Sequence, residues 1–159
     1  MKITFVCTGN TCRSCMAEGI FRATAENRPD KMSFTAMSRG IFANDGEGAS
    51  QHSVKVLATL WNIDISLHKA KMLNSTDVDL SDLILTATRS HRDALKQMYP
   101  NSSKHIFTLK EYINPDIPKN DKSLDISDPY GLPYDRYEAC AREIYDCINL
   151  LINKLTKTA

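Results

Sequence analysis

The sequence lacks a long apolar run and any marked excess of charge. No stretch approaches the ~20 apolar residues that a membrane-spanning helix needs, and the apolar run at residues 3–6 is too short for the core of a signal peptide. Lysine and arginine number 20 against 19 aspartates and glutamates, a net charge of +1, so bulk charge attracts neither nucleic acid nor an anionic membrane. We therefore expect a cytoplasmic protein that binds anions only through local arrangement.

Cysteines are few and odd in number, which argues against a secreted disulfide framework. The five are Cys7, Cys12, Cys15, Cys140 and Cys147. A secreted framework normally pairs an even number of cysteines in a shorter chain. Cys140 and Cys147 lie on one predicted helix with their Cα atoms about 10 Å apart, too far for an undistorted disulfide. We expect reduced thiols and assign this pair to core packing.

The rest of the composition is that of a folded domain. Over 159 residues, 42% are hydrophobic and 25% charged, which fits one domain spanning residues 1–159. Short apolar runs predict strands at residues 3–6, 32–37, 83–86 and 106–109. Helical spacing of apolar residues predicts helices within residues 16–25, 54–61, 90–98 and 137–155, and residues 38–50 and 113–134 are expected to be loops. Strands alternating with helices predict an α/β fold, a small parallel four-stranded sheet with helices on both faces.

The loop after the first strand carries the clearest chemical signal, because ligands of such sheets bind at the carboxyl ends of the strands. It runs Val6-Cys7-Thr8-Gly9-Asn10-Thr11-Cys12-Arg13-Ser14. Backbone N–H groups at a helix start, curled by Gly9 and Asn10, form a cradle for a tetrahedral oxyanion, and Arg13 adds a fork that grips two anion oxygens. The same positive field favours the thiolate of Cys7, to which Ser14 can donate a hydrogen bond. We therefore predict a phosphate-binding loop with a nucleophile at its base.

A second signal lies in the loop at residues 113–134, where Asp128 precedes Pro129. Cleavage of a phosphoester requires a proton on the leaving oxygen, and a carboxylic acid at the sheet edge where the Cys7 loop opens can supply it. The predicted mechanism has two steps. Cys7 attacks phosphorus while Asp128 protonates the leaving group, and Asp128 then activates the water that releases phosphate. The scheme needs no metal ion or other cofactor.

These motifs resemble the low-molecular-weight protein tyrosine phosphatases. The loop with the following Met16-Ala17-Glu18, and the segment Asp128-Pro129-Tyr130, match the family's patterns, and the resemblance covers essentially the whole chain. It implies that Cys7 is the nucleophile, Arg13 the phosphate clamp and Asp128 the general acid. It further implies that His68 supports the loop together with Asn10 and Ser14, although Lys71 replaces the arginine of the family's segment. The implied substrate-binding residues are Thr8, Gly9, Asn10, Thr11, Cys12, Ser14 and Tyr130.

One position in the anion loop bears on the choice of substrate. Many tyrosine-specific members carry a bulky aliphatic residue where Thr11 stands, and a threonine leaves room for a hydrogen bond to a guanidinium, as in the bacterial protein-arginine phosphatase branch that this sequence resembles. Tyr130 can stack on a phenol or on a guanidinium. We expect phosphorylated proteins or peptides as partners, phosphoarginine slightly favoured over phosphotyrosine, and a monomer or weak dimer.

Other interpretations of the same residues remain open. Cys12 and Cys15 form a Cys-x-x-Cys at a helix start, but a thioredoxin-like site needs a nearby proline loop, and no proline lies between Pro29 and Pro100. No second pair of close ligands completes a zinc site. The anion loop also resembles that of arsenate reductases, but those enzymes relay electrons through two further cysteines. A phosphopeptide-binding module is another alternative, and it would need neither Cys7 nor an acid. A reversible Cys7–Cys12 disulfide under peroxide is a further hypothesis.

Overall fold

A parallel four-stranded sheet forms the centre of the computed structural model, which describes residues 1–29 and 33–157. Its strands are β1 (Lys2–Cys7), β2 (Thr35–Gly40), β3 (Leu83–Thr86) and β4 (Ile106–Thr108). They lie in the order β2-β1-β3-β4. β1 is central and pairs with β2 from Lys2 opposite Thr35 to Cys7 opposite Gly40. This register puts the end of β2 directly beside the cysteine that begins the anion loop.

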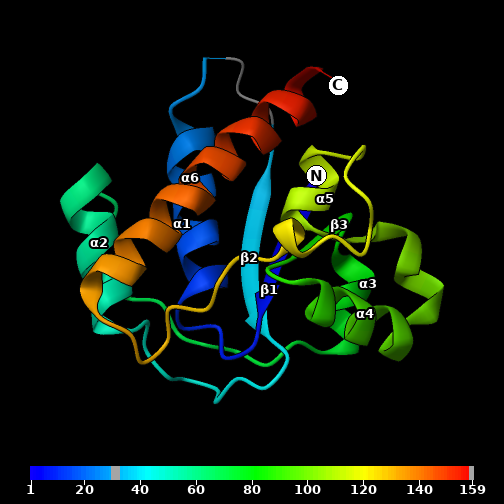
Figure 1. The fold of residues 1–159 in the computed structure, drawn as a ribbon, viewed down its shortest axis with the longest axis horizontal. Coiled ribbons are helices and arrows are strands. Elements are labelled where there is room, and N and C mark those ends of the chain that lie inside the picture. Colours follow the sequence, from blue (N-terminus) through cyan, green and yellow to red (C-terminus); the bar gives the residue numbers. More distant parts are fainter. Residues whose placement is uncertain (30–32, 158–159) are drawn as a thin grey trace.

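Helices cover both faces of the sheet, as predicted for the α/β fold (Figure 1). The α-helices are α1 (Arg13–Glu26), α2 (Gln51–Trp61), α3 (Ser75–Leu80), α4 (Arg89–Met98), α5 (Leu109–Ile113) and α6 (Tyr134–Lys157), with 3₁₀ turns η1 (Pro100–His105) and η2 (Lys122–Leu124). Side chains alternate across a strand, so Ile3 and Phe5 pack into the larger core under α1 and α6, whereas Val6 packs into the smaller core under α3 and α4.

The last helix, α6, buries the apolar face that its sequence predicts. Its buried side chains include the six at the predicted positions, Tyr137, Ala141, Ile144, Ile148, Leu151 and Leu155. Cys140 and Cys147 are buried on the same helix, which confirms their assignment to the core. None of the helices in the described part of the chain combines the length and apolar character needed to cross a bilayer.

Parts of the secondary structure differ from the sequence-based expectations. β2 continues to Gly40, because its polar end still pairs with β1, so the following loop begins at Ile41 rather than residue 38. The predicted start of this strand at Met32 lies outside the described residues. Leu109 is helical rather than part of β4, because Thr108 and Glu111 form a capping box that starts α5. The short helix α3 was not predicted, although Asn74 caps it.

Candidate active site

The anion loop is held open by a single buried asparagine. Asn10 has a left-handed backbone conformation, with φ of 60°, which asparagine tolerates better than most residues. Its Nδ2 donates to Ser14 Oγ at 2.8 Å and to Ser38 Oγ at 2.9 Å, and its Oδ1 accepts the backbone N–H of Lys71 at 3.0 Å. Side-chain bonds to α1, β2 and the loop before α3 therefore fix the turn.

Cys7 lies at the end of β1, buried at the base of this loop. Its Sγ is 2.9 Å from Ser14 Oγ. Because Ser14 Oγ accepts a hydrogen bond from Asn10 Nδ2, its own hydrogen is available to the sulfur. Cys12, the N-cap of α1, makes no side-chain cap in the described structure, so the first backbone N–H groups of α1 remain available to an anion. The sulfur of Cys7 therefore lies beside a hydrogen-bond donor and near the N-terminal end of α1.

Arg13 links the anion loop to the loop that carries Asp128. Its buried guanidinium donates from Nη1 to the carbonyl of Ile126 at 2.9 Å, and its Nη2 lies 3.4 Å from Asp128 Oδ2. The Asp128 side chain is 51% exposed, so it stands at the mouth of the site, where it can meet a leaving group. The backbone N–H of Tyr130 donates to Asp128 Oδ1 at 3.1 Å and orients the carboxylate. The two loops, far apart in sequence, thus share one ion pair.

A cavity of about 250 Å³ opens over these groups. It is lined by Cys7, Thr8, Gly9, Thr11, Cys12, Arg13, Phe42, Asn44, Glu47, Asp128 and Tyr130. Eight of these were expected site residues, and Asn10 and Ser14 lie behind the loop instead of in the cavity lining. Sequence reasoning missed Phe42, Asn44 and Glu47. The available signal was their position after β2, since that loop also leaves the carboxyl edge of the sheet.

His68 contacts the backbone of the anion loop. Its Nε2 lies 2.7 Å from the carbonyl oxygen of Asn10. A carbonyl oxygen only accepts, so the Nε2–H of His68 donates this bond. His68 was among the residues expected to support the anion loop. The fold brings it into contact with Asn10, from which it is 58 positions away in the sequence.

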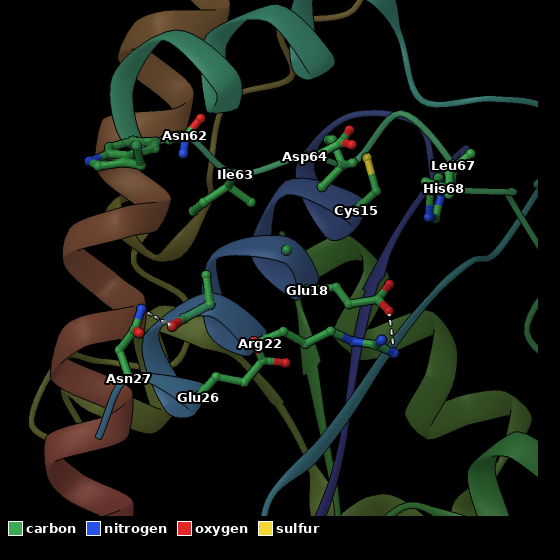
Figure 2. A pocket seen from close by; sticks show the side chains of 14 residues that line it. Cys15, Glu18, Arg22, Glu26, Asn27, Asn62, Ile63, Asp64, Leu67 and His68 are labelled. Carbon is green, nitrogen blue, oxygen red and sulfur yellow. Dashed lines mark hydrogen bonds and ion pairs between the residues drawn. The ribbon is translucent and has the colours of Figure 1, made fainter. Parts of the chain in front are cut away.

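His68 also lines a second, larger cavity of about 660 Å³ between α1 and the segment after α2 (Figure 2). Glu18, Glu26 and Asp64 contribute three carboxylates to this lining, and Arg22 contributes a guanidinium. Figure 2 shows that guanidinium paired with Glu18, at 2.8 Å. Three carboxylates around a paired arginine do not suit a phosphate dianion, whereas the smaller cavity is lined by Arg13 and lies at the start of α1.

The sequence comparison agrees with this geometry. Residues 2–159 match the family described as low molecular weight phosphotyrosine protein phosphatase. The chain belongs to this family.

Its relatives include enzymes named for two different substrates. A low molecular weight protein tyrosine phosphatase from T. tengcongensis is 42% identical, with a TM-score of 0.87 over 97% of this chain and 99% of that one. A protein-arginine-phosphatase from Bacillus subtilis is 32% identical over 99% of this chain and 98% of its own length. The structure of a C7S mutant of YwlE arginine phosphatase with a phosphorylated active-site serine is 31% identical, with a TM-score of 0.89 over 99% of this chain and 97% of that one.

The remaining cysteines lie in surroundings that suppress their ionisation. Burial raises the pKa of Cys15 well above its usual value, that of Cys140 to about 12 and that of Cys147 to about 11. The Cys15 thiol donates to the carbonyl of Cys12 at 3.2 Å. Because a thiolate is the reactive form, none of these three thiols is a suitable nucleophile near neutral pH.

Two residues in the first turn of α4 contact the loops that form the site and were missed. His91 Nε2 lies 2.9 Å from Thr8 Oγ1. Arg89 binds both carboxylate oxygens of Asp125, at 3.1 Å and 2.9 Å, and so ties down the loop that carries Asp128. No local pattern marks either residue, since each contact depends on folding of distant segments.

Proposed function

We propose that this chain is a protein phosphatase that hydrolyses phosphorylated side chains through a cysteinyl-phosphate intermediate. The observation that carries the proposal is the shared cavity of Cys7, Arg13 and Asp128, with the Ser14 hydroxyl 2.9 Å from the sulfur. The phosphorylated active-site serine of the related C7S mutant supports an intermediate on the side chain at this position.

The reaction has two displacements at phosphorus. The Cys7 thiolate attacks in line, the bond to the leaving atom breaks, and Asp128 gives that atom its proton. The loop amides and Arg13 stabilise the equatorial oxygens, the largest expected contribution. Asp128, now a carboxylate, takes a proton from water, whose oxygen attacks phosphorus and releases inorganic phosphate. The Cys7 thiolate departs, stabilised by the hydrogen bond from Ser14.

Phosphoarginine is the substrate that the cavity favours. Its guanidinium carries N–H donors next to the phosphorus, whereas a phenol ring carries none. Thr11 and Glu47 both line the cavity, and a hydroxyl and a carboxylate are acceptors for such donors. The exposed aromatic rings of Phe42 and Tyr130 can stack on a guanidinium. The same two rings suit phosphotyrosine, which is therefore the second candidate.

The setting of the activity follows from the same residues and charges. We infer that the substrates are phosphorylated proteins or peptides, that residues 1–159 act as a single domain, and that the protein works in the cytoplasm as a monomer or weak dimer. A net charge of +1 supports no nucleic-acid or membrane partner.

The experiment compares kcat/KM on matched phosphoarginine and phosphotyrosine peptides at neutral pH, because the P–N bond is labile in acid. Thr11→Val removes the hydroxyl at nearly constant volume, and Thr11→Ser retains it as the matched control. We expect Thr11→Val to lose about five- to tenfold on phosphoarginine, the effect of one hydrogen bond, and to change little on phosphotyrosine. A wild-type preference for phosphotyrosine would refute the substrate assignment, and turnover by Cys7→Ser would refute the mechanism.

A further inference from the structure

The first turn of α4 contacts the anion loop from outside the cavity. Thr88 is the N-cap of α4, and its Oγ1 accepts the backbone N–H of His91 at 3.2 Å. The His91 ring lies between two hydroxyls, with Nδ1 3.0 Å from Thr88 Oγ1 and Nε2 2.9 Å from Thr8 Oγ1. A single buried ring therefore joins the start of α4 to the residue that follows Cys7.

The His91 ring is neutral near neutral pH. Burial, followed by the nearby positive charge of Arg13, lowers the pKa of His91 to about 4, and the carboxylates of Asp128 and Asp125 offset this only in part. Thr88 Oγ1 accepts the backbone N–H, and its own hydrogen can donate to Nδ1. The ring proton then lies on Nε2, from which it donates to Thr8.

Two hydrogen bonds hold Thr8, one at its backbone and one at its side chain. Its carbonyl accepts the backbone N–H of Phe42 at 2.9 Å, and its hydroxyl is held by His91. Thr8 lines the cavity directly after Cys7, so a change in its orientation moves the first amides of the phosphate cradle. Without His91, the Thr8 hydroxyl would lose this partner, and Thr8 would keep its backbone bond to Phe42.

Packing alone does not explain a histidine at this position. One turn further along α4, Leu95 fills the core with no polar atom and is fully buried. A buried position that needed only volume would hold a similar residue. At His91 both ring nitrogens have partners, and one of those partners belongs to the candidate active site.

We propose that His91 is a positioning residue for the phosphate-binding loop, acting through the hydroxyl of Thr8. The proposal rests on the proposed function only in that the loop binds phosphate. A neutral hydrogen bond contributes ~1 kcal/mol, which corresponds to about a fivefold change in an equilibrium or rate constant.

The test is a double-mutant cycle of His91→Asn and Thr8→Val. An asparagine amide occupies the place of Nδ1, so it keeps the bond to Thr88 and loses the bond to Thr8. The exposed His105 on η1 gives the matched control, His105→Asn. For each variant the measurements are the affinity for inorganic phosphate by titration calorimetry, kcat/KM on p-nitrophenyl phosphate and the melting temperature.

We expect His91→Asn and Thr8→Val each to weaken phosphate binding and kcat/KM about fivefold, and the double variant to lose no more than the larger single loss. His105→Asn stays within twofold of the wild type. Losses that multiply in the double variant, or single losses below twofold, overturn the proposal. Thr8→Val removes the same bond from an exposed side chain, so if His91→Asn does not fold, a Thr8→Val variant within twofold of the wild type still overturns the proposal.

Phosphate affinity is measured without turnover, which separates this proposal from the proposed function. A wild type that binds phosphate but hydrolyses no phosphorylated substrate contradicts the proposed function, and the affinities of the variants still decide the role of His91.

Discussion

Gly40 allows the sheet and the anion loop to approach each other, and Gly40→Ala should damage the site directly. Gly40 ends β2 opposite Cys7. A Cβ added there would lie 2.5 Å from the carbonyl oxygen of Thr8, 2.9 Å from Ala43 Cβ and 3.1 Å from the backbone nitrogen of Asn10. Two of these three atoms belong to the backbone of the anion loop, so no side-chain rotation can relieve the clash.

The required displacement sets the size of the effect. Ordinary contact begins near 3.4 Å, so the Thr8 carbonyl and the new methyl group must separate by about 0.9 Å. Overpacking of this kind costs about 1–3 kcal/mol of stability. A misplacement of about 1 Å in a catalytic site can cost ~10²-fold in rate. We therefore expect Gly40→Ala to fold with reduced stability and to lose about 10- to 100-fold in kcat/KM.

The matched control is Gly48→Ala in the loop that follows β2, where an added Cβ meets no atom within 4 Å. Urea unfolding measures the stability of both variants, and hydrolysis of p-nitrophenyl phosphate measures their kcat/KM. We expect Gly48→Ala to match the wild type. If Gly40→Ala keeps kcat/KM within twofold of the wild type, the close approach of β2 does not shape the loop and the reasoning fails.

Two further predictions concern ion pairs outside the phosphate cradle. Arg89 holds the pKa of Asp125 below its usual value in the folded protein. The Asp125 carboxylate therefore stabilises the fold at any pH above its pKa in the unfolded chain. This contribution is lost as the pH falls through the lower pKa of the folded state. Melting curves should therefore show Asp125→Asn less stable than the wild type at pH 7, with the gap closing in acid; a gap independent of pH contradicts this. Glu111 Oε2 lies 3.0 Å from Nη1 of the buried Arg92. Because Glu111→Gln removes the negative charge from this pair, it should lower the free energy of unfolding, measured in urea, by about 2 kcal/mol. Glu138→Gln, in an exposed helix pair, should change it by less than about 1 kcal/mol, and equal losses for the two variants would contradict the role of burial.

The parts of the site that sequence could predict are those formed locally. Cys7, the glycine and asparagine of the loop, and Arg13 lie on consecutive residues between one strand and one helix, so their spacing alone predicts the cradle. β3 lies where its apolar run predicted, and α6 shows the predicted buried face. Such features depend on hydrophobic periodicity and on the geometry of a helix start.

The parts that sequence could not predict are contacts closed by the fold. Thr8 and His91 are 83 residues apart, and Asn10 and Ser38 are 28 apart. The end of β2 is polar and continues as a strand only because β1 pairs with it. The capping box of α5 was visible in the sequence, at Thr108 and Glu111, and a strand interpretation of the apolar run overlooked it.

Asn10 explains why the loop combines a left-handed backbone with such a fixed shape. Glycine adopts a positive φ at no steric cost, but it has no side chain with which to bind its neighbours. Asparagine tolerates φ of 60° and uses three side-chain hydrogen bonds to fasten the turn to Ser14, Ser38 and Lys71. Because one of those bonds leaves the Ser14 hydrogen free for Cys7, the residue that shapes the cradle also prepares its nucleophile. The shape of the loop and the reactivity of its thiol therefore depend on the same buried amide.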